Sequence, residues 1–90
     1  MKNKKQDSLI NFRKAQSHLG KIIKMIESNE YCINIMQQNL AVIGLLRSAH
    51  QMLMENHLNT CFLKAMESKV EAKKQQMIKE ILQVSKLVNK

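Results

Sequence analysis

The sequence contains no proline, no tryptophan and only two glycines in 90 residues. Aromatic residues are limited to one tyrosine and two phenylalanines, so Leu, Ile and Met must supply the core. No apolar run reaches the ~18–20 residues that a membrane span needs, and the amino end lacks the continuous apolar stretch of a signal peptide. The composition predicts an all-α protein in the cytoplasm, with no membrane partner.

Acidic residues are also few, with seven against 15 basic residues and a net charge of +8. Most of the excess lies in residues 1–26, which hold seven basic residues and one acidic residue. Such a charge favours a polyanionic partner, and double-stranded DNA is the expected one for a compact helical domain. Lysines that are simply solvated would account for the same charge.

The first six residues are rich in lysine and show no apolar periodicity, so we expect them to be disordered until a partner binds. The remaining sequence has apolar residues at three- and four-residue steps, which is typical of amphipathic helices. A chain of this size buries only a modest core alone, so we expect self-association to complete a helical bundle. The predicted organisation is a basic tail over 1–6 and a single domain over 7–90, with helices at about 7–28, 30–66 and 69–88.

Local signals place the ends and the middle of these helices. Asp7 or Ser8 can cap the first helix, because either side chain accepts from free main-chain N–H groups. Asn29 can end it, since asparagine tolerates the left-handed conformation found after helices. Residues 40–46 are apolar almost all round except for Gly44, which indicates close packing at the middle of the second helix.

Both cysteines lie on the predicted second helix, together with a histidine. In a cytoplasmic protein Cys32 and Cys61 are expected to remain thiols. At about 100° per residue, His57 and Cys61 each return to within ~20° of the direction of Cys32. Yet Cys32 lies roughly 38 Å from His57 along the helix axis. An antiparallel copy of the same helix would bring them together, so this stripe predicts a dimer with two identical sites.

Two thiolates and one imidazole form a soft ligand set that suits Cu(I), which accepts three ligands and favours sulfur. A structural zinc site would want a fourth ligand. His50 is ~10 Å from His57 along the axis and is expected to pack or to donate a hydrogen bond, and His18 has no assigned role. Any one of these residues alone is also explained by packing. No catalytic triad, carboxylate pair or phosphate loop is present, so the protein is not expected to be an enzyme.

The Cys…His-x-x-x-Cys pattern of Cys32, His57 and Cys61 resembles the copper-sensitive operon repressor (CsoR) family, whose relatives include nickel- and formaldehyde-responsive repressors. The resemblance covers roughly residues 9–66, and the ligand spacing is its most specific part. Neighbouring residues agree with it: Met25-Ile26-Glu27, Tyr31-Cys32, Gln37-Gln38, Ala41-Val42 and His57-Leu58.

The resemblance implies a three-helix protomer, an antiparallel four-helix-bundle dimer and a dimer of dimers. It implies that Cys32 of one chain joins His57 and Cys61 of the other around Cu(I), with Tyr31 supporting the site by hydrogen bonding. A glutamate on the third helix also supports the site in the family's copper sensors. The nearest one here is Glu80, three residues after the matching position. Dimer and tetramer both remain open, as does another soft metal.

The implied function is a transcriptional repressor that binds operator DNA without metal and is released on Cu(I) binding. The repressed genes would be those for copper export or chaperoning, and a copper chaperone is a further expected partner. The resemblance and the charge together select four DNA-binding residues: Arg13, Lys14, Lys21 and Arg47.

Two alternatives remain open within the same fold. The segment Lys14-Ala15-Gln16-Ser17-His18 departs from the Arg-x-x-Gly-Gln-like segment of the family, and Ile43 stands where relatives often carry a basic residue. These departures favour a copper-binding homologue that has lost operator binding. The other alternative is a persulfide- or thiol-sensing repressor that links Cys32 to Cys61 of another chain, although that branch of the family lacks the histidine at His57.

Overall fold

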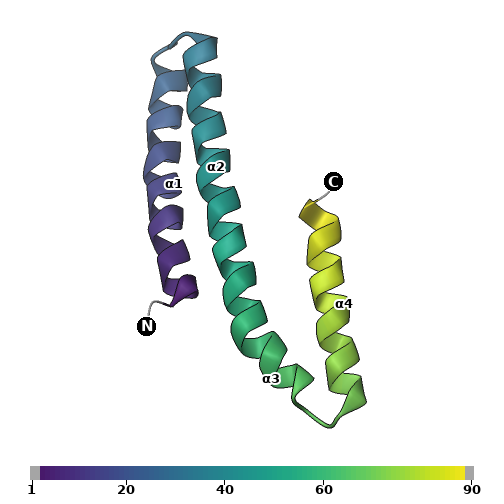
Figure 1. The fold of residues 1–90 in the computed structure, drawn as a ribbon. Coiled ribbons are helices and arrows are strands. Elements are labelled where there is room, and N and C mark those ends of the chain that lie inside the picture. Colours follow the sequence, from purple (N-terminus) through teal and green to yellow (C-terminus); the bar gives the residue numbers. More distant parts are fainter. Residues whose placement is uncertain (1–2, 89–90) are drawn as a thin grey trace. The chain divides into compact units, whose positions relative to one another are not determined.

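The computed structural model describes residues 3–88, and this part of the chain contains helices and no strand (Figure 1). The all-α prediction is therefore confirmed. None of the helices within these residues is long and apolar enough to cross a membrane. The chain divides into two compact units, the first ending at Asn56 and the second beginning at His57. The elements are α1 (Lys4–Glu27), α2 (Cys32–His57), the π-helical segment η1 (Leu58–Phe62), α3 (Leu63–Met66) and α4 (Glu71–Val88).

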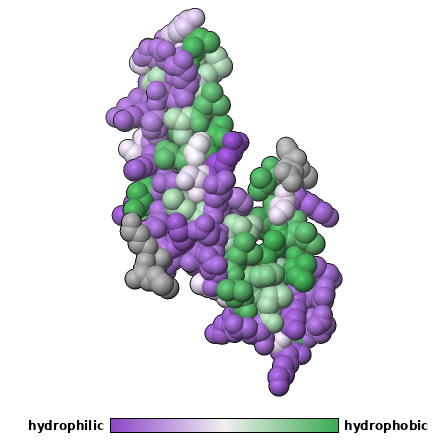
Figure 2. Space-filling model, viewed as in Figure 1, coloured by the Kyte–Doolittle hydropathy of each residue, from purple (hydrophilic) through white to green (hydrophobic). Residues whose placement is uncertain are grey.

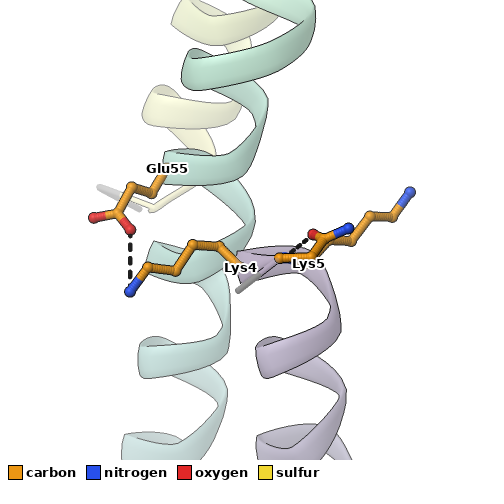
Figure 3. Close-up of polar contacts among 4 residues, drawn as sticks. Lys4, Lys5 and Glu55 are labelled. Atoms are coloured by element: carbon orange, nitrogen blue, oxygen red, sulfur yellow. Dashed lines mark hydrogen bonds and ion pairs between the residues drawn. The ribbon is translucent and has the colours of Figure 1, made fainter. Parts of the chain in front are cut away.

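Helix α1 begins earlier than the sequence predicts. The side chain of Asn3 accepts a hydrogen bond from the Lys5 N–H at 2.9 Å (Figure 3), which caps the helix at Asn3 rather than at Asp7 or Ser8. Residues 4–6 of the predicted tail are therefore helical. Apolar periodicity could not reveal this, because an N-cap needs only one suitable polar side chain. Residues 1 and 2 of that tail lie outside the described residues.

The connection between α1 and α2 follows the predicted stop. Asn29 adopts φ 57, its N–H donates to the Ile26 carbonyl at 3.1 Å, and the Glu30 N–H donates to the Met25 carbonyl at 2.9 Å. This pair of bonds is a Schellman motif, which satisfies carbonyls that the end of a helix leaves without partners. Asparagine at this position confirms the predicted end of the first helix.

Helices α1 and α2 form an antiparallel hairpin (Figure 1), and polar contacts fix its register. The His18 ring is hydrogen-bonded to the side chain of Gln38. The side-chain amide of Asn11 donates to the Leu45 carbonyl at 3.5 Å. The buried positions recur seven residues apart on each helix, as in a coiled-coil seam: Ser8 and Ala15 on α1, and Val42 and Ala49 on α2.

An ion pair also joins the two helices of the hairpin. The Lys4 ammonium lies 3.4 Å from the Glu55 carboxylate, where both side chains are about half exposed (Figure 3). An exposed pair of this kind contributes only about 0–1 kcal/mol. The stability of the hairpin must therefore come from packing within the seam and from burial of the apolar surfaces that lie outside the seam.

Large apolar side chains lie at the surface of both units (Figure 2). Within one chain the core is made of alanine, valine and serine, rather than of the Leu, Ile and Met that composition predicts. The reason is that the heptad positions of the hairpin carry small and polar residues, while the large apolar ones occupy neighbouring stripes. On α1 these are Leu9, Ile10, Phe12, Leu19, Ile23 and Ile26, and on α2 Ile33, Met36, Leu40, Ile43 and Leu46.

The long second helix predicted over 30–66 changes its hydrogen-bond pattern partway. Leu58–Phe62 is a π-helix, although the backbone stays right-handed at His57 (φ −62, ψ −44) and at Leu63 (φ −59, ψ −43). A π-helix pairs residues five apart and so takes one residue more per turn than an α-helix. Asn59 and Thr60, both weak helix formers, lie at the centre of this segment.

In the second unit, α3 contacts α4. A short turn joins them near the predicted break at Glu67-Ser68. The Glu67 N–H donates to the Leu63 carbonyl and the Ser68 N–H to the Ala65 carbonyl, each at 3.1 Å. The Ser68 hydroxyl then accepts from the Val70 N–H at 3.1 Å. Helix α4 therefore begins only at Glu71, within two residues of the prediction.

The left-handed backbone of Asn29 gives a test of the turn. Asn29→Val should lower the free energy of unfolding by about 1–2 kcal/mol, because a β-branched side chain clashes with its own backbone at positive φ. Asn29→Gly is the matched control and should retain or raise stability. Urea denaturation of both variants would measure the effect, and equal stabilities would contradict the conformation described here.

The seam gives a second test. Ala49 is fully buried, so Ala49→Leu should lower the free energy of unfolding by about 1–3 kcal/mol through overpacking. Ala41→Leu adds the same side chain at an exposed position of the same helix and should change stability by no more than about 0.5 kcal/mol. Urea titrations of the two variants at equal chain concentration would decide. Similar losses at both positions would show that Ala49 does not lie in a tight seam.

Candidate metal centre

Cys32 is the first residue of α2, and its thiol is exposed. The Tyr31 carbonyl starts the helix by accepting from the N–H groups of Asn34 and Ile35 at 3.0 and 3.3 Å. The Glu30 carboxylate, just before the helix, accepts from the Asn34 side chain at 3.4 Å. The position of Cys32 is thus fixed by ordinary helix-start contacts, while the sulfur itself remains accessible.

His57 and Cys61 lie where α2 passes into η1. His57, the last residue of α2, is half-buried, and no hydrogen bond engages its ring within the described residues. Cys61 is in η1 and is exposed, and its sulfur accepts a hydrogen bond from the Thr60 hydroxyl at 3.7 Å. Neither Cys61 nor Cys32 forms a disulfide. Apart from the Thr60 contact to Cys61, no polar contact within residues 3–88 engages the donor atoms of the three predicted ligands.

The π-helical segment changes the predicted angle around the helix axis between His57 and Cys61. His57 returns to within ~20° of Cys32 because α2 is a regular α-helix throughout. Cys61 lies within η1, where each residue rotates the chain by less than the ~100° of an α-helix. The angle between His57 and Cys61 therefore differs from that of a regular i, i+4 pair. Asn59 and Thr60 lower the helix propensity of this segment, but that property does not specify a π turn.

One chain does not bring the predicted ligands together. Cys32 and His57 are the two ends of α2, which separates them by roughly 38 Å along the axis. Within residues 3–88, no group of three His, Cys, Asp or Glu side chains is placed to hold a metal ion. The donor set itself fits a soft metal, since it consists of two free thiols and an imidazole.

The residues predicted to support the site lie apart from it in the chain. Tyr31 directly precedes Cys32, and its side chain is 68% exposed. Glu80 lies on α4, where its carboxylate accepts a hydrogen bond from the Gln76 side chain at 3.4 Å. Their supporting roles remain predictions.

The other two histidines have different surroundings. His18 pairs with Gln38 inside the hairpin seam, which gives a structural role to a residue that sequence left unassigned. His50 is half-buried on α2, and no hydrogen bond engages its ring in the part of the chain that the structure describes.

The basic residues predicted to contact DNA are exposed and have no acidic partner. Within residues 3–88 the structure contains one ion pair, between Lys4 and Glu55. Spacing of seven places Lys14 and Lys21 within ~20° of each other on α1. The exposed set comprises Arg13, Lys14 and Lys21 on α1, and Arg47 on α2.

Comparison with known proteins identifies the family to which this chain is similar. The profile of the metal-sensitive transcriptional repressors matches residues 4–87. The copper-sensing transcriptional repressor CsoR of Mycobacterium ulcerans (strain Agy99) is 42% identical over 60 residues, which are 67% of this chain and 51% of the relative. CsoR of Mycobacterium tuberculosis (strain ATCC 25618 / H37Rv) is 39% identical over 59 residues, 66% of this chain and 50% of the relative.

A further relative is the copper-sensing transcriptional repressor RicR of Mycobacterium tuberculosis (strain ATCC 25618 / H37Rv), 36% identical over 53 residues, 59% of this chain and 55% of the relative. The chain spans about half the length of these curated relatives. The match to the family profile, by contrast, covers nearly the whole chain. The chain therefore belongs to the metal-sensitive transcriptional repressor family, a family of regulators rather than enzymes, as its lack of catalytic motifs predicts.

Proposed function

We propose that this protein is a Cu(I)-responsive transcriptional repressor, which binds operator DNA in the apo form and releases it when Cu(I) binds. The observation that carries the proposal is the position of Cys32 and His57 at the two ends of one helix, with both thiols of the chain free. The named relatives are copper-sensing repressors, which supports copper as the signal.

A second, antiparallel copy of the chain completes each site in this proposal. Cys32 of one chain meets the partner's His57 and the partner's Cys61. The outward face of α2 supports such pairing, because Met36 and Ile43 are exposed there between the two ends. Burying an apolar side chain of this size is worth about 1.5–3 kcal/mol, and several on each chain would contribute.

The ligand chemistry favours Cu(I). Two thiolates supply sulfur, which a soft monovalent metal prefers, and one imidazole completes a three-coordinate set. The Thr60 hydroxyl donates to the Cys61 sulfur and can orient it, as residues beyond the ligands do in metal sites. Bound there, Cu(I) supplies only coordination bonds, which couple the two chains.

Phosphate contacts by basic residues would supply most of the DNA affinity. Arg13, Lys14 and Lys21 on α1 and Arg47 on α2 are exposed and lack acidic partners among the described residues. Release requires the metal-bound form to bind DNA more weakly than the apo form, a coupling that typically reaches 1–3 kcal/mol.

One observation favours a second candidate function. The segment from Lys14 to His18 departs from the family's first-helix pattern, and His18 is engaged by Gln38 inside the hairpin. A copper-binding homologue without operator binding would keep the ligand set and lose this DNA surface. The two candidate functions predict different DNA binding, which the anisotropy measurement below tests.

His57→Ala tests the ligand assignment. Removing a ligand should lower Cu(I) affinity by more than about 100-fold, beyond the loss expected for a supporting residue. Competition with a Cu(I) chelator under anaerobic conditions would measure it, with Gln51→Ala, at an exposed position of α2, as the control that keeps the proposed set. Unchanged affinity in His57→Ala would refute the assignment. Crosslinking of Cys32 to Cys61 through sulfur does not require the imidazole and should be preserved in this variant.

Fluorescence anisotropy with DNA from upstream of the protein's own gene tests the repressor function. Apo protein should bind specifically, and one Cu(I) per chain should weaken binding by about 5–150-fold. Lys21→Ala should reduce the slope of log affinity against log salt by about one, whereas Lys73→Ala on α4 should leave it unchanged. Absence of specific binding with and without Cu(I) would establish the copper-binding homologue instead.

A further inference from the structure

Four soft donor side chains on α2 are not used by the proposed centre, and all but Met52 share one face of the helix. Met36 is 52% exposed, and His50 and Met54 are half-buried. Met36 and Met54 are separated by about five full turns and so point in the same direction from the helix, with His50 within ~40° of them. All three belong to the first compact unit, in which the hairpin holds α2 against α1.

The register of the proposed dimer brings these side chains together across the interface. Met36 lies one turn inward from Cys32, and Met54 lies one turn inward from His57. In an antiparallel pair that joins Cys32 to the partner's His57, one turn inward from either residue reaches the same position along the shared helix axis. Met36 of one chain then faces the partner's Met54, and the partner's His50 follows one turn further on.

We propose that Met36, together with the partner subunit's Met54 and the partner subunit's His50, forms a second Cu(I) site at each end of the dimer interface. This inference rests on the proposed antiparallel dimer. The two-fold axis produces two such sites, each about one helical turn inward from a Cys32 centre. The dimer thus has four Cu(I) sites in total, two per chain.

The chemistry of the donors determines what this second site binds. Thioether sulfur is soft and selects Cu(I), and imidazole suits copper as well. The set carries no negative charge, whereas the Cys32 and Cys61 thiolates do. The second site therefore binds Cu(I) more weakly than the first and fills after it. Ag(I), a soft monovalent ion of the same charge, is a suitable redox-stable probe.

Packing alone is the competing explanation, because methionine fills irregular gaps at interfaces. Leucine separates the two explanations, since Met-to-Leu exchange conserves volume and removes only the sulfur. The double variant Met36→Leu/Met54→Leu keeps an apolar interface while it loses both thioether ligands. Met25→Leu/Met52→Leu is a matched control, since neither residue contributes to the proposed set and both are half-buried on the hairpin helices.

The test is an anaerobic Cu(I) titration of the full chain with a chelator of moderate affinity, repeated with Ag(I). We expect two equivalents per chain for the unaltered protein and for Met25→Leu/Met52→Leu, with the second bound at least tenfold more weakly. Met36→Leu/Met54→Leu should bind one equivalent at unaltered affinity. Sedimentation should show the same oligomer for all three proteins.

The outcomes separate this inference from the proposed function. One equivalent per chain in the unaltered protein, lost in His57→Ala, would leave the sensor site standing and overturn the second site. Two equivalents in both the unaltered protein and Met36→Leu/Met54→Leu would also overturn it. A monomeric protein, or loss of the tight equivalent in Met36→Leu/Met54→Leu with His57→Ala unaffected, would instead overturn the proposed centre and its register.

Discussion

Close approach of α1 and α2 depends on a seam of small side chains. Ala15 and Ala49 are almost completely buried there, and the polar pair of His18 and Gln38 fixes the register. Small residues allow two helices to lie near each other, but they bury little apolar area. The larger apolar side chains are consequently displaced to neighbouring stripes, where one chain alone cannot cover them. The shape of the seam therefore determines which faces remain available for other contacts.

The same arrangement places the predicted ligand residues and the exposed apolar residues on one side of α2. Cys32 and His57 end the helix, and exposed apolar residues such as Ile43 lie between them. In the proposed function, the contacts that pair two chains and the ligands that bind Cu(I) belong to one continuous face. Metal binding and association would then be coupled directly, since each site draws its ligands from both chains.

The sequence was sufficient for much of the fold. Periodicity indicated the all-α class, and the tolerance of asparagine for positive φ pointed to Asn29 as the residue that follows the end of the first helix. Periodicity could not tell which stripe faces the hairpin seam, because small seam residues such as Ala15 give a weaker hydrophobic signal than the exposed stripe beside them. It also missed the cap at Asn3, which depends on a single side chain. The proposed ligand set draws on a second chain, so the role of Cys32, His57 and Cys61 stays a prediction.

The π-helical segment Leu58–Phe62 has a consequence for how such a protein can change during evolution. Because a π turn holds one residue more than an α turn, deletion of one residue would restore a regular helix there. The residues after the deletion would keep nearly the same direction around the helix axis, because the turn would close with one residue fewer. A change of length by one residue within this turn could therefore alter the number of residues between His57 and Cys61 without any substitution. Ligand spacing, as well as ligand identity, is thus open to selection at this point of the chain.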